Sequence, residues 1–332
     1  MHYLLPLCFC LLGLFSQAVA QEKKLVVATA SMIADMADNI SGGLVTVESI
    51  VPIGGDPHLH EPTPKDARLV KRADLVLRNG LTFEGWLSEL IDNSGTSARS
   101  VRVTEGIDPI SSKTYQNSAD PHAWMDVRLG LKYIENIKNA LIELAPEYRE
   151  EFEFNYGVYK RQLEDLDQYI RQEIEKIPSG QRVLITSHDA FQYYGRAYGI
   201  RLEAVIGTST EEDAETSDII RLNRVIREEK IPAVFVESTV NPKLLEQLAA
   251  DNKVKIGGKL YADSIGDENS PASTYLDMLK YDTDVIVAAL SVRTDTNPVV
   301  GETTETSSGS NWWLYGLIGL FLVGGFVFMA RS

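Results

Sequence analysis

Residues 147–177 read EYREEFEFNYGVYKRQLEDLDQYIRQEIEKI, a stretch with no proline and a single glycine. Its many Glu, Lys, Arg, Tyr and Leu residues are typical of one long helix, which Pro178 would end. At about 1.5 Å per residue, such a helix spans roughly 45 Å, which exceeds the width of a lobe. A coiled-coil arm is the alternative, but a heptad repeat is not sustained. We therefore expect a strut that connects two lobes.

Short apolar runs alternate with helical patterns on both sides of this stretch. The expected strands are 24–29, 44–51, 74–78 and 100–103 in the first half, and 182–186, 202–206, 233–237 and 253–256 in the second. Strands that alternate with helices predict mostly parallel sheets with helices on both faces. The predicted fold class is α/β, with two β/α lobes, at 21–146 and 178–293, joined by one long rigid helix at 147–177.

The tripeptide Asp-Pro-His occurs twice, at 56–58 and at 120–122. The chain has five histidines, and three of them lie in or beside these two copies. His188 ends a further apolar run. Each histidine alone is explained as well by a loop cap or a buried hydrogen bond. Because ligands bind beyond the carboxyl ends of parallel strands, these scarce imidazoles together indicate a metal site in the cleft between the lobes.

Residues 1–20 have an apolar centre and end in Ala18-Val-Ala20, which is typical of a cleaved secretory signal. A short N-terminal membrane anchor is the alternative. Both cysteines of the chain, Cys8 and Cys10, lie in this segment. After cleavage the protein would offer no thiolate, so any metal must be bound by nitrogen and oxygen atoms.

The segment 312–330 carries no charged side chain, and its length suits one membrane-spanning helix, which needs about 20 residues. Thr, Ser, Gly and acidic residues dominate 294–311, which is typical of a flexible tether. A hydrophobic core helix is the alternative interpretation of 312–330. We expect an exported protein, periplasmic or on the outer face of the cytoplasmic membrane, tethered by a C-terminal transmembrane helix.

The formal net charge of the chain is −15 at pH 7. This balance argues against nucleic acid as a partner, since binding requires cations that neutralise phosphates. An acidic chain is compatible with a cationic ligand, although acidity also serves solubility.

Six motifs occur along the chain. They are DPHLHEPTP at 56–64, NGLTFEGW at 79–86, DPHAW at 120–124, TSHDAF at 186–191, FVES at 235–238 and LYADSIG at 260–266. Through these motifs, over about residues 24–292, the chain resembles the TroA-like family of solute-binding proteins of zinc and manganese ABC importers. The resemblance implies two β/α lobes bridged by one long helix. It also implies four metal ligands, which are His58, His122, His188 and Asp263.

The resemblance implies a protein that captures a divalent transition metal and delivers it to an ABC importer permease in the same membrane. Such a protein is expected to be a monomer and not an enzyme. Three imidazoles and a carboxylate can complete a four-ligand shell for Zn²⁺, or supply part of a larger shell for Mn²⁺ or Fe²⁺. The nitrogen ligands favour Zn²⁺. The 105–119 loop lacks the histidine-rich sequence of many zinc-specific members, which keeps Mn²⁺ a close second and Fe²⁺ a further candidate.

Besides the missing histidine-rich loop, two features depart from the family pattern. His60 occupies a position where many relatives carry an aromatic residue. It is expected to support a neighbouring ligand, to act as an alternative ligand, or to lie in solvent. A C-terminal membrane anchor is also unusual, because relatives are commonly free in the periplasm or anchored by lipid.

Three other functions compete with metal import. An exported zinc hydrolase would keep an open metal position beside three protein ligands and would need a general base, for which Glu61 and Glu237 are the candidates. A surface adhesin that uses a metal-binding fold is a second alternative. A siderophore-binding relative is a third, but its cleft would need aromatic and Arg side chains more than three imidazoles.

Overall fold

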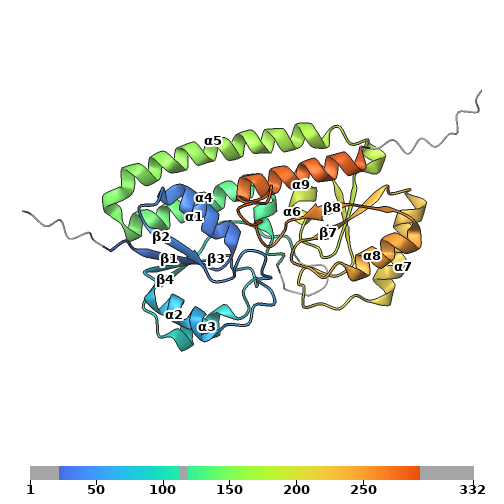
Figure 1. Cartoon of the computed structure of the whole chain (residues 1–332). Helices are drawn as coiled ribbons and strands as arrows, with labels where there is room; N and C mark the ends of the chain where they lie inside the picture. Colours follow the sequence, from blue (N-terminus) through green and yellow to red (C-terminus); the bar gives the residue numbers. More distant parts are fainter. Residues whose placement is uncertain (1–21, 112–118, 292–332) are drawn as a thin grey trace, which may run out of the picture. The chain divides into compact units, whose positions relative to one another are not determined.

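A four-stranded parallel sheet forms the centre of the first lobe (Figure 1). The computed structural model describes residues 22–111 and 119–291. The strands of this sheet are β1 (Leu25–Ala28), β2 (Thr46–Ser49), β3 (Leu75–Arg78) and β4 (Arg99–Arg102), in the spatial order β2-β1-β3-β4. The carboxyl ends of all four strands therefore lie along the same edge.

Helices cover both faces of this sheet. They are α1 (Ser31–Ser41), α2 (Pro64–Arg72), α3 (Leu87–Ser94) and α4 (Val127–Leu144). Along β1, Val26 and Ala28 join the hydrophobic cluster under α1 and α4, whereas Val27 joins the cluster under α2 and α3. Because both faces are buried, the strand is a continuous apolar run and not an alternating one.

The second lobe repeats the β/α arrangement. Its strands are β5 (Val183–Thr186), β6 (Arg201–Ala204), β7 (Ala233–Glu237) and β8 (Lys255–Leu260), and its helices are α6 (Gln192–Tyr198), α7 (Thr216–Glu228), α8 (Lys243–Asn252) and α9 (Tyr275–Leu290). β5 pairs with β6 and β7 pairs with β8, both in parallel. Short 3-10 helices, η1 (Ala123–Met125), η2 (Pro146–Tyr148) and η3 (Ser179–Gln181), precede α4, α5 and β5.

The longest described helix, α5 (Arg149–Ile174), runs along both lobes (Figure 1). It packs against α1 and α4 of the first lobe and against α9 of the second. The helix lies inside the predicted 147–177 stretch, where the turn η2 precedes it. One hydrophobic cluster includes α5 and residues of both lobes, so the sequence-based lobe boundaries stay a prediction.

The predicted fold class is wrong in one part, the C-terminal membrane-spanning helix. Within residues 22–111 and 119–291, no helix is both long enough and apolar enough to cross a membrane. The physical reason is clear for α5, which has the length but carries many charged side chains. The segments 1–20, 294–311 and 312–330 lie outside the described residues. The fold class of the described chain is therefore two-lobed α/β without that helix.

Candidate metal centre

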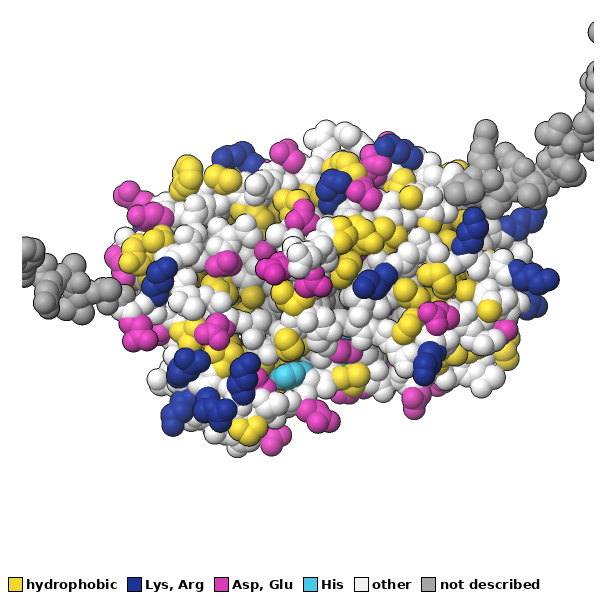
Figure 2. All heavy atoms as spheres, viewed as in Figure 1, with side chains coloured by type: hydrophobic (Ala, Val, Ile, Leu, Met, Phe, Trp, Pro, Cys, Tyr) yellow, Lys and Arg dark blue, Asp and Glu magenta, His cyan; other side chains and the backbone are white. Residues whose placement is uncertain are grey.

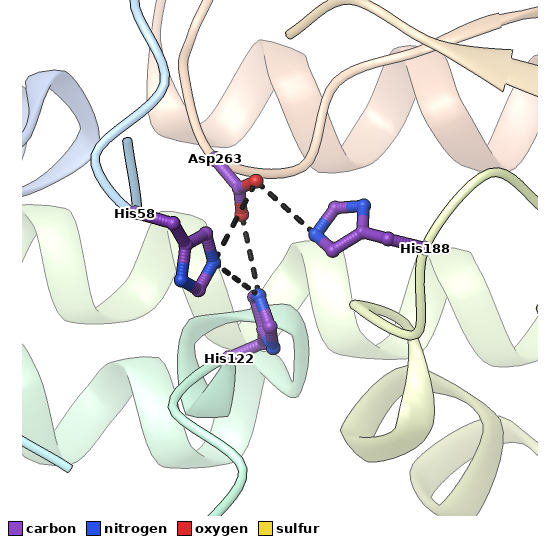
Figure 3. Close-up of side chains that lie close together, drawn as sticks. All are labelled: His58, His122, His188 and Asp263. Carbon is purple, nitrogen blue, oxygen red and sulfur yellow. Dashed lines mark hydrogen bonds and ion pairs between the residues drawn. The ribbon is translucent and has the colours of Figure 1, made fainter. Parts of the chain in front are cut away.

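Four side chains predicted from the sequence converge on one point between the lobes. One potential ligand atom from each of His58, His122, His188 and Asp263 lies within 4.8 Å of those of the others. All four residues are buried, with exposed fractions of 8% for His58 and 0% for the other three. Figure 3 shows the three rings and the carboxylate pointing toward one another.

The distances between these atoms are short enough for one ion to reach all of them. The Nε2 atoms of His58 and His122 are 3.3 Å apart. The carboxylate of Asp263 lies 3.1 Å from Nε2 of His188, 3.4 Å from Nε2 of His122 and 4.0 Å from Nε2 of His58. Each imidazole thus presents Nε2 to the centre.

The fold explains why residues so distant in sequence meet. His58 follows β2, His188 follows β5 and Asp263 follows β8, each beyond the carboxyl end of its strand. His122 directly precedes η1 and α4. This is the edge of a parallel α/β sheet at which ligands bind.

The two copies of Asp-Pro-His make the same backbone turn. Oδ1 of Asp56 accepts the backbone N–H of His58 at 2.8 Å, and Oδ1 of Asp120 accepts that of His122 at 2.9 Å. Only the second aspartate also reaches the ring, because Asp120 Oδ1 lies 2.7 Å from Nδ1 of His122. Both aspartates therefore hold the backbone of their histidine, and Asp120 alone also contacts the ring.

His188 has a carboxylate partner of the same kind. Oε1 of Glu237 accepts the backbone N–H of His188 at 2.8 Å, and Oε2 lies 2.7 Å from Nδ1 of its ring. Such partners fix the orientation and tautomer of a histidine that binds metal through Nε2. The sequence analysis named Glu237 only as a base for a hydrolase, and it did not recognise Asp120. Two features of the sequence could have identified these residues. Glu237 stands at the end of a predicted strand, and Asp120 stands two residues before a histidine.

Hydrogen bonds from both lobes hold the residues just before Asp263. The indole N–H of Trp124 donates to the carbonyl of Ala262 at 2.9 Å. The backbone N–H of Tyr261 donates to Oδ1 of Asp282 at 3.0 Å. The two residues that precede Asp263 are therefore fixed by groups outside the loop.

The electrostatics of the group suit a cation. Both carboxylate oxygens of Asp263 are buried, and neither accepts a well-formed hydrogen bond from the described residues. Burial opposes its ionisation, but His188 and His122 outweigh burial and hold the pKa of Asp263 well below its ordinary value. A buried carboxylate without hydrogen bonds is costly unless a positive charge lies beside it.

The three imidazoles differ in their surroundings. Burial lowers the pKa of His58 to about 3. Burial also opposes protonation of His122, but Asp120 and Asp263 outweigh it and raise its pKa to about 9. Protons on the imidazoles and a divalent cation would therefore compete for the same nitrogen atoms. Three nitrogens and one carboxylate oxygen match the donor set of a tetrahedral Zn²⁺ site and part of a larger Mn²⁺ or Fe²⁺ shell.

His60 lies outside this group. Its Nε2 is 3.2 Å from Oδ2 of Asp66 at the start of α2, and its ring packs on Trp86 with centroids 4.8 Å apart. Trp86 in turn donates its indole N–H to the carbonyl of Pro57 at 2.8 Å. Three roles were considered for His60. These contacts agree with one of them, in which His60 supports the loop that carries the neighbouring ligand His58.

The fold and this group of side chains define a class, the two-lobed α/β binding proteins with a buried site of metal-ligand type. Comparison with known proteins is more specific. The chain belongs to the family whose model is described as "ZnuA: Zinc-uptake complex component A periplasmic", which matches residues 26–289. The sequence-based resemblance to zinc and manganese binding proteins of ABC importers is thereby confirmed.

Named relatives and solved structures agree with this membership. The chain is 38% identical over 281 residues to the zinc-binding protein TroA of Treponema pallidum, which covers 82% of this chain and 91% of TroA. It is 36% identical over 266 residues to the manganese-binding lipoprotein MntA of Halalkalibacterium halodurans, with 80% and 88% covered. The structure of Treponema pallidum TroA superposes with a TM-score of 0.77 at 37% identity, covering 81% of this chain and 99% of that one. A manganese-bound periplasmic metal-binding protein from Candidatus Liberibacter asiaticus gives 0.74 at 31% identity, with 81% and 100% covered.

Proposed function

We propose that this protein captures a divalent transition metal outside the cytoplasmic membrane and delivers it to the permease of an ABC importer. The observation that carries the proposal is the buried convergence of three imidazoles and one carboxylate. Relatives named as metal ABC transporter substrate-binding lipoproteins support it. The metal is the transported substrate and not a resident cofactor.

We assign the ligand roles to His58, His122, His188 and Asp263. Two ligands come from the first lobe and two from the second, so a bound ion would join the lobes. The imidazoles would bind as neutral groups through Nε2. Asp263 would supply the one negative charge that faces the ion directly.

Zinc is the proposed metal, with manganese close behind and iron as a further candidate. Three nitrogen ligands support zinc. A site with such ligands also has a higher intrinsic affinity for Zn²⁺ than for Mn²⁺. The relatives support both metals, because TroA is named for zinc and MntA for manganese.

We infer that the protein is not an enzyme. A hydrolytic zinc site keeps one position open for water and has a base beside it. Here four protein groups surround the centre, and Glu237 is bound to His188. Glu61, the other candidate base, is exposed. Metal-dependent turnover of an ester or peptide by the purified protein would overturn this inference.

The proposed place of action is outside the cytoplasmic membrane. The signal-like sequence at 1–20, the word periplasmic in the family description and the lipoprotein names of relatives support it. Action as a monomer stays a prediction from the sequence.

Titration of the purified protein with Zn²⁺ and Mn²⁺ against a competing chelator tests the ligand assignment. His58→Ala, His122→Ala and His188→Ala are each expected to weaken binding at least about a hundredfold, since each removes one of few ligands. His60→Ala is the matched control and should lose much less affinity than these variants, because the ring of His60 contacts Asp66 and Trp86 and none of the four ligand side chains. Tight binding by all three ligand variants would contradict the assignment.

A further inference from the structure

Four cationic side chains gather on α2 of the first lobe, and we call them the basic face. They are Lys65, Arg68, Lys71 and Arg72, and all four are exposed. Figure 2 shows dark-blue side chains gathered at the lower left, over the place that α2 has in Figure 1. The spacing of Lys65, Arg68 and Arg72 places them on one side of the helix. The face is strongly positive on a chain of net charge −15.

These cations have no partners among the residues that the structure describes. None of the four side chains forms an ion pair or a hydrogen bond there. The acidic residue of the helix, Asp66, is buried and contacts His60 instead. Elsewhere, α5 and α9 pair cations with acids four residues away, as in Lys160–Glu164 and Lys280–Asp284. Among the described residues, single unpaired cations also occur on other helices, such as Arg161 on α5, but α2 carries four of them within nine residues.

Stability of the helix does not account for the basic face. Lys71 and Arg72 lie in the last turn, where cations interact favourably with the helix dipole. Lys65 lies in the first turn, where a cation is unfavourable. Like charges three or four residues apart, such as Lys65 with Arg68 and Arg68 with Arg72, also destabilise a helix. An anionic partner would remove this repulsion.

The shape of the face favours a protein partner over a flat membrane surface. The four side chains, with Glu48 and Leu69, line a hollow of about 310 Å³. A hollow of this size can seat acidic side chains of a polypeptide loop. The face is also joined to the proposed ligand loop, because Asp66 contacts His60 two residues after His58.

We propose that the basic face docks an acidic loop of the membrane permease that receives the metal. The proposal rests on the proposed transport function and adds to it the contact that delivers the ion. Docking at α2 would then act next to the loop that carries His58.

The test compares two doubly substituted full-length proteins in the source cells, from which the native gene is deleted. Lys65→Glu with Arg68→Glu reverses two charges of the basic face, and glutamate near a helix N-terminus favours the helix. Arg149→Glu with Arg161→Glu makes the same charge change on α5, which lies beyond the helices covering the opposite face of the sheet. Uptake of radioactive Zn²⁺ is measured in cells, and Zn²⁺ affinity is measured on the purified proteins.

We expect Lys65→Glu/Arg68→Glu to lower uptake at least about tenfold while Zn²⁺ affinity stays within about twofold of the wild type. The α5 variant and the charge-preserving variant Lys65→Arg/Arg68→Lys should keep both properties. Wild-type uptake in Lys65→Glu/Arg68→Glu, or an equal loss in the α5 variant, would overturn the proposal.

Two further outcomes separate the alternatives. If the wild type binds vesicles of phosphatidylglycerol and phosphatidylcholine and Lys65→Glu/Arg68→Glu does not, the face binds lipid and the permease proposal is overturned. If deletion of the gene leaves Zn²⁺ and Mn²⁺ uptake unchanged, the transport function fails, and the docking proposal fails with it.

Discussion

At the scale of single residues, two buried carboxylates determine how two imidazoles face the proposed metal position. Asp120 and Glu237 each lie 2.7 Å from the Nδ1 atom of their histidine. A carboxylate there favours a proton on Nδ1 and leaves Nε2 free to bind. The ring of His58 has a different contact, an edge-on packing with Phe83 at 4.8 Å between centroids. Carboxylates therefore orient the rings of His122 and His188, whereas an aromatic ring packs against that of His58.

Glu237→Gln is expected to weaken Zn²⁺ binding about 10- to 100-fold, because an amide orients the ring of His188 less strongly than a carboxylate does. Competitive titration with a chelator measures the effect. Glu61→Gln changes an exposed glutamate in the same way and should leave the affinity unaltered. If Glu237→Gln bound Zn²⁺ as tightly as the wild type, the carboxylate would have no role in orienting His188.

The histidines could be predicted from the sequence because they are few and follow strand-like runs. The role of Glu237 could not, since it lies 49 residues from His188 and meets it only where β5 and β7 come together. The repeated tripeptide did not reveal Asp120 either. The equivalent Asp56 contacts only the backbone N–H of its histidine, so the repeat itself does not distinguish the two aspartates.

At the scale of elements, Ser264 connects the loop after β8 to the first lobe. Its Oγ accepts the backbone N–H of Gly54 at 2.7 Å and lies 3.1 Å from Oγ of Ser31 at the start of α1. The Oγ of Ser31 also accepts the backbone N–H of Ile265 at 3.1 Å. The loops that carry His58 and Asp263 are thus linked beside the proposed site.

Ser264→Ala is expected to speed the release of bound Zn²⁺ about tenfold, since it removes hydrogen bonds that each contribute about 1 kcal/mol. Stopped-flow mixing of the loaded protein with excess chelator measures the rate. Ser270→Ala removes a hydroxyl that bonds only within its own loop, to the N–H of Ala272, and should not change the rate. Equal release rates in all three proteins would contradict a role for the link.

Asp35 couples three helices and makes stability depend on pH. In α1, it accepts the backbone N–H of Tyr275 at the start of α9 and lies 3.5 Å from the hydroxyl of Tyr159 in α5. Burial, with Asp38 and Asp277 nearby, raises the pKa of Asp35 from 3.8 to about 6. The folded state therefore holds this proton more tightly than the unfolded state does. The resulting stability is present below about pH 4 and is lost as pH rises toward 6.

Asp35→Asn keeps the acceptor for Tyr275 and removes the charge. The variant is expected to gain stability relative to the wild type as pH rises from 4 to 6, by up to about 3 kcal/mol. Denaturant unfolding of the metal-free proteins at several pH values measures the difference. A constant difference across this range would show that Asp35 titrates normally.

The ends of elements were harder to predict than their presence. The strand expected at 253–256 is β8, which begins at Lys255 and continues to Leu260. The strand therefore extends through Gly257 and Gly258, which the predicted strand did not include. In the structure a Cβ at Gly257 would lie 2.6 Å from Cε1 of Phe235, so glycine allows this ring to pack on the strand. That contact depends on the pairing of β7 with β8, which cannot be predicted from the residues of β8 alone.

At the scale of the whole molecule, alternating strands and helices and one long charged helix were sufficient to predict a two-lobed α/β fold. The prediction of a membrane-spanning helix relied on the length and lack of charge of 312–330 and on the tether-like composition of 294–311, and no described helix is long and apolar enough to span a membrane. The net charge of −15 argued against nucleic acid as a partner, but it did not predict the basic face of α2. A total charge carries no information about where charges of each sign gather.

The central claim is that His58, His122, His188 and Asp263 together hold the transported metal. Crystals grown with Zn²⁺ and measured on both sides of the zinc absorption edge test it most directly. We predict one strong anomalous peak about 2.0–2.2 Å from the three Nε2 atoms and from an oxygen of Asp263. An empty centre in crystals whose protein carries zinc elsewhere, for example at His60, would contradict the claim.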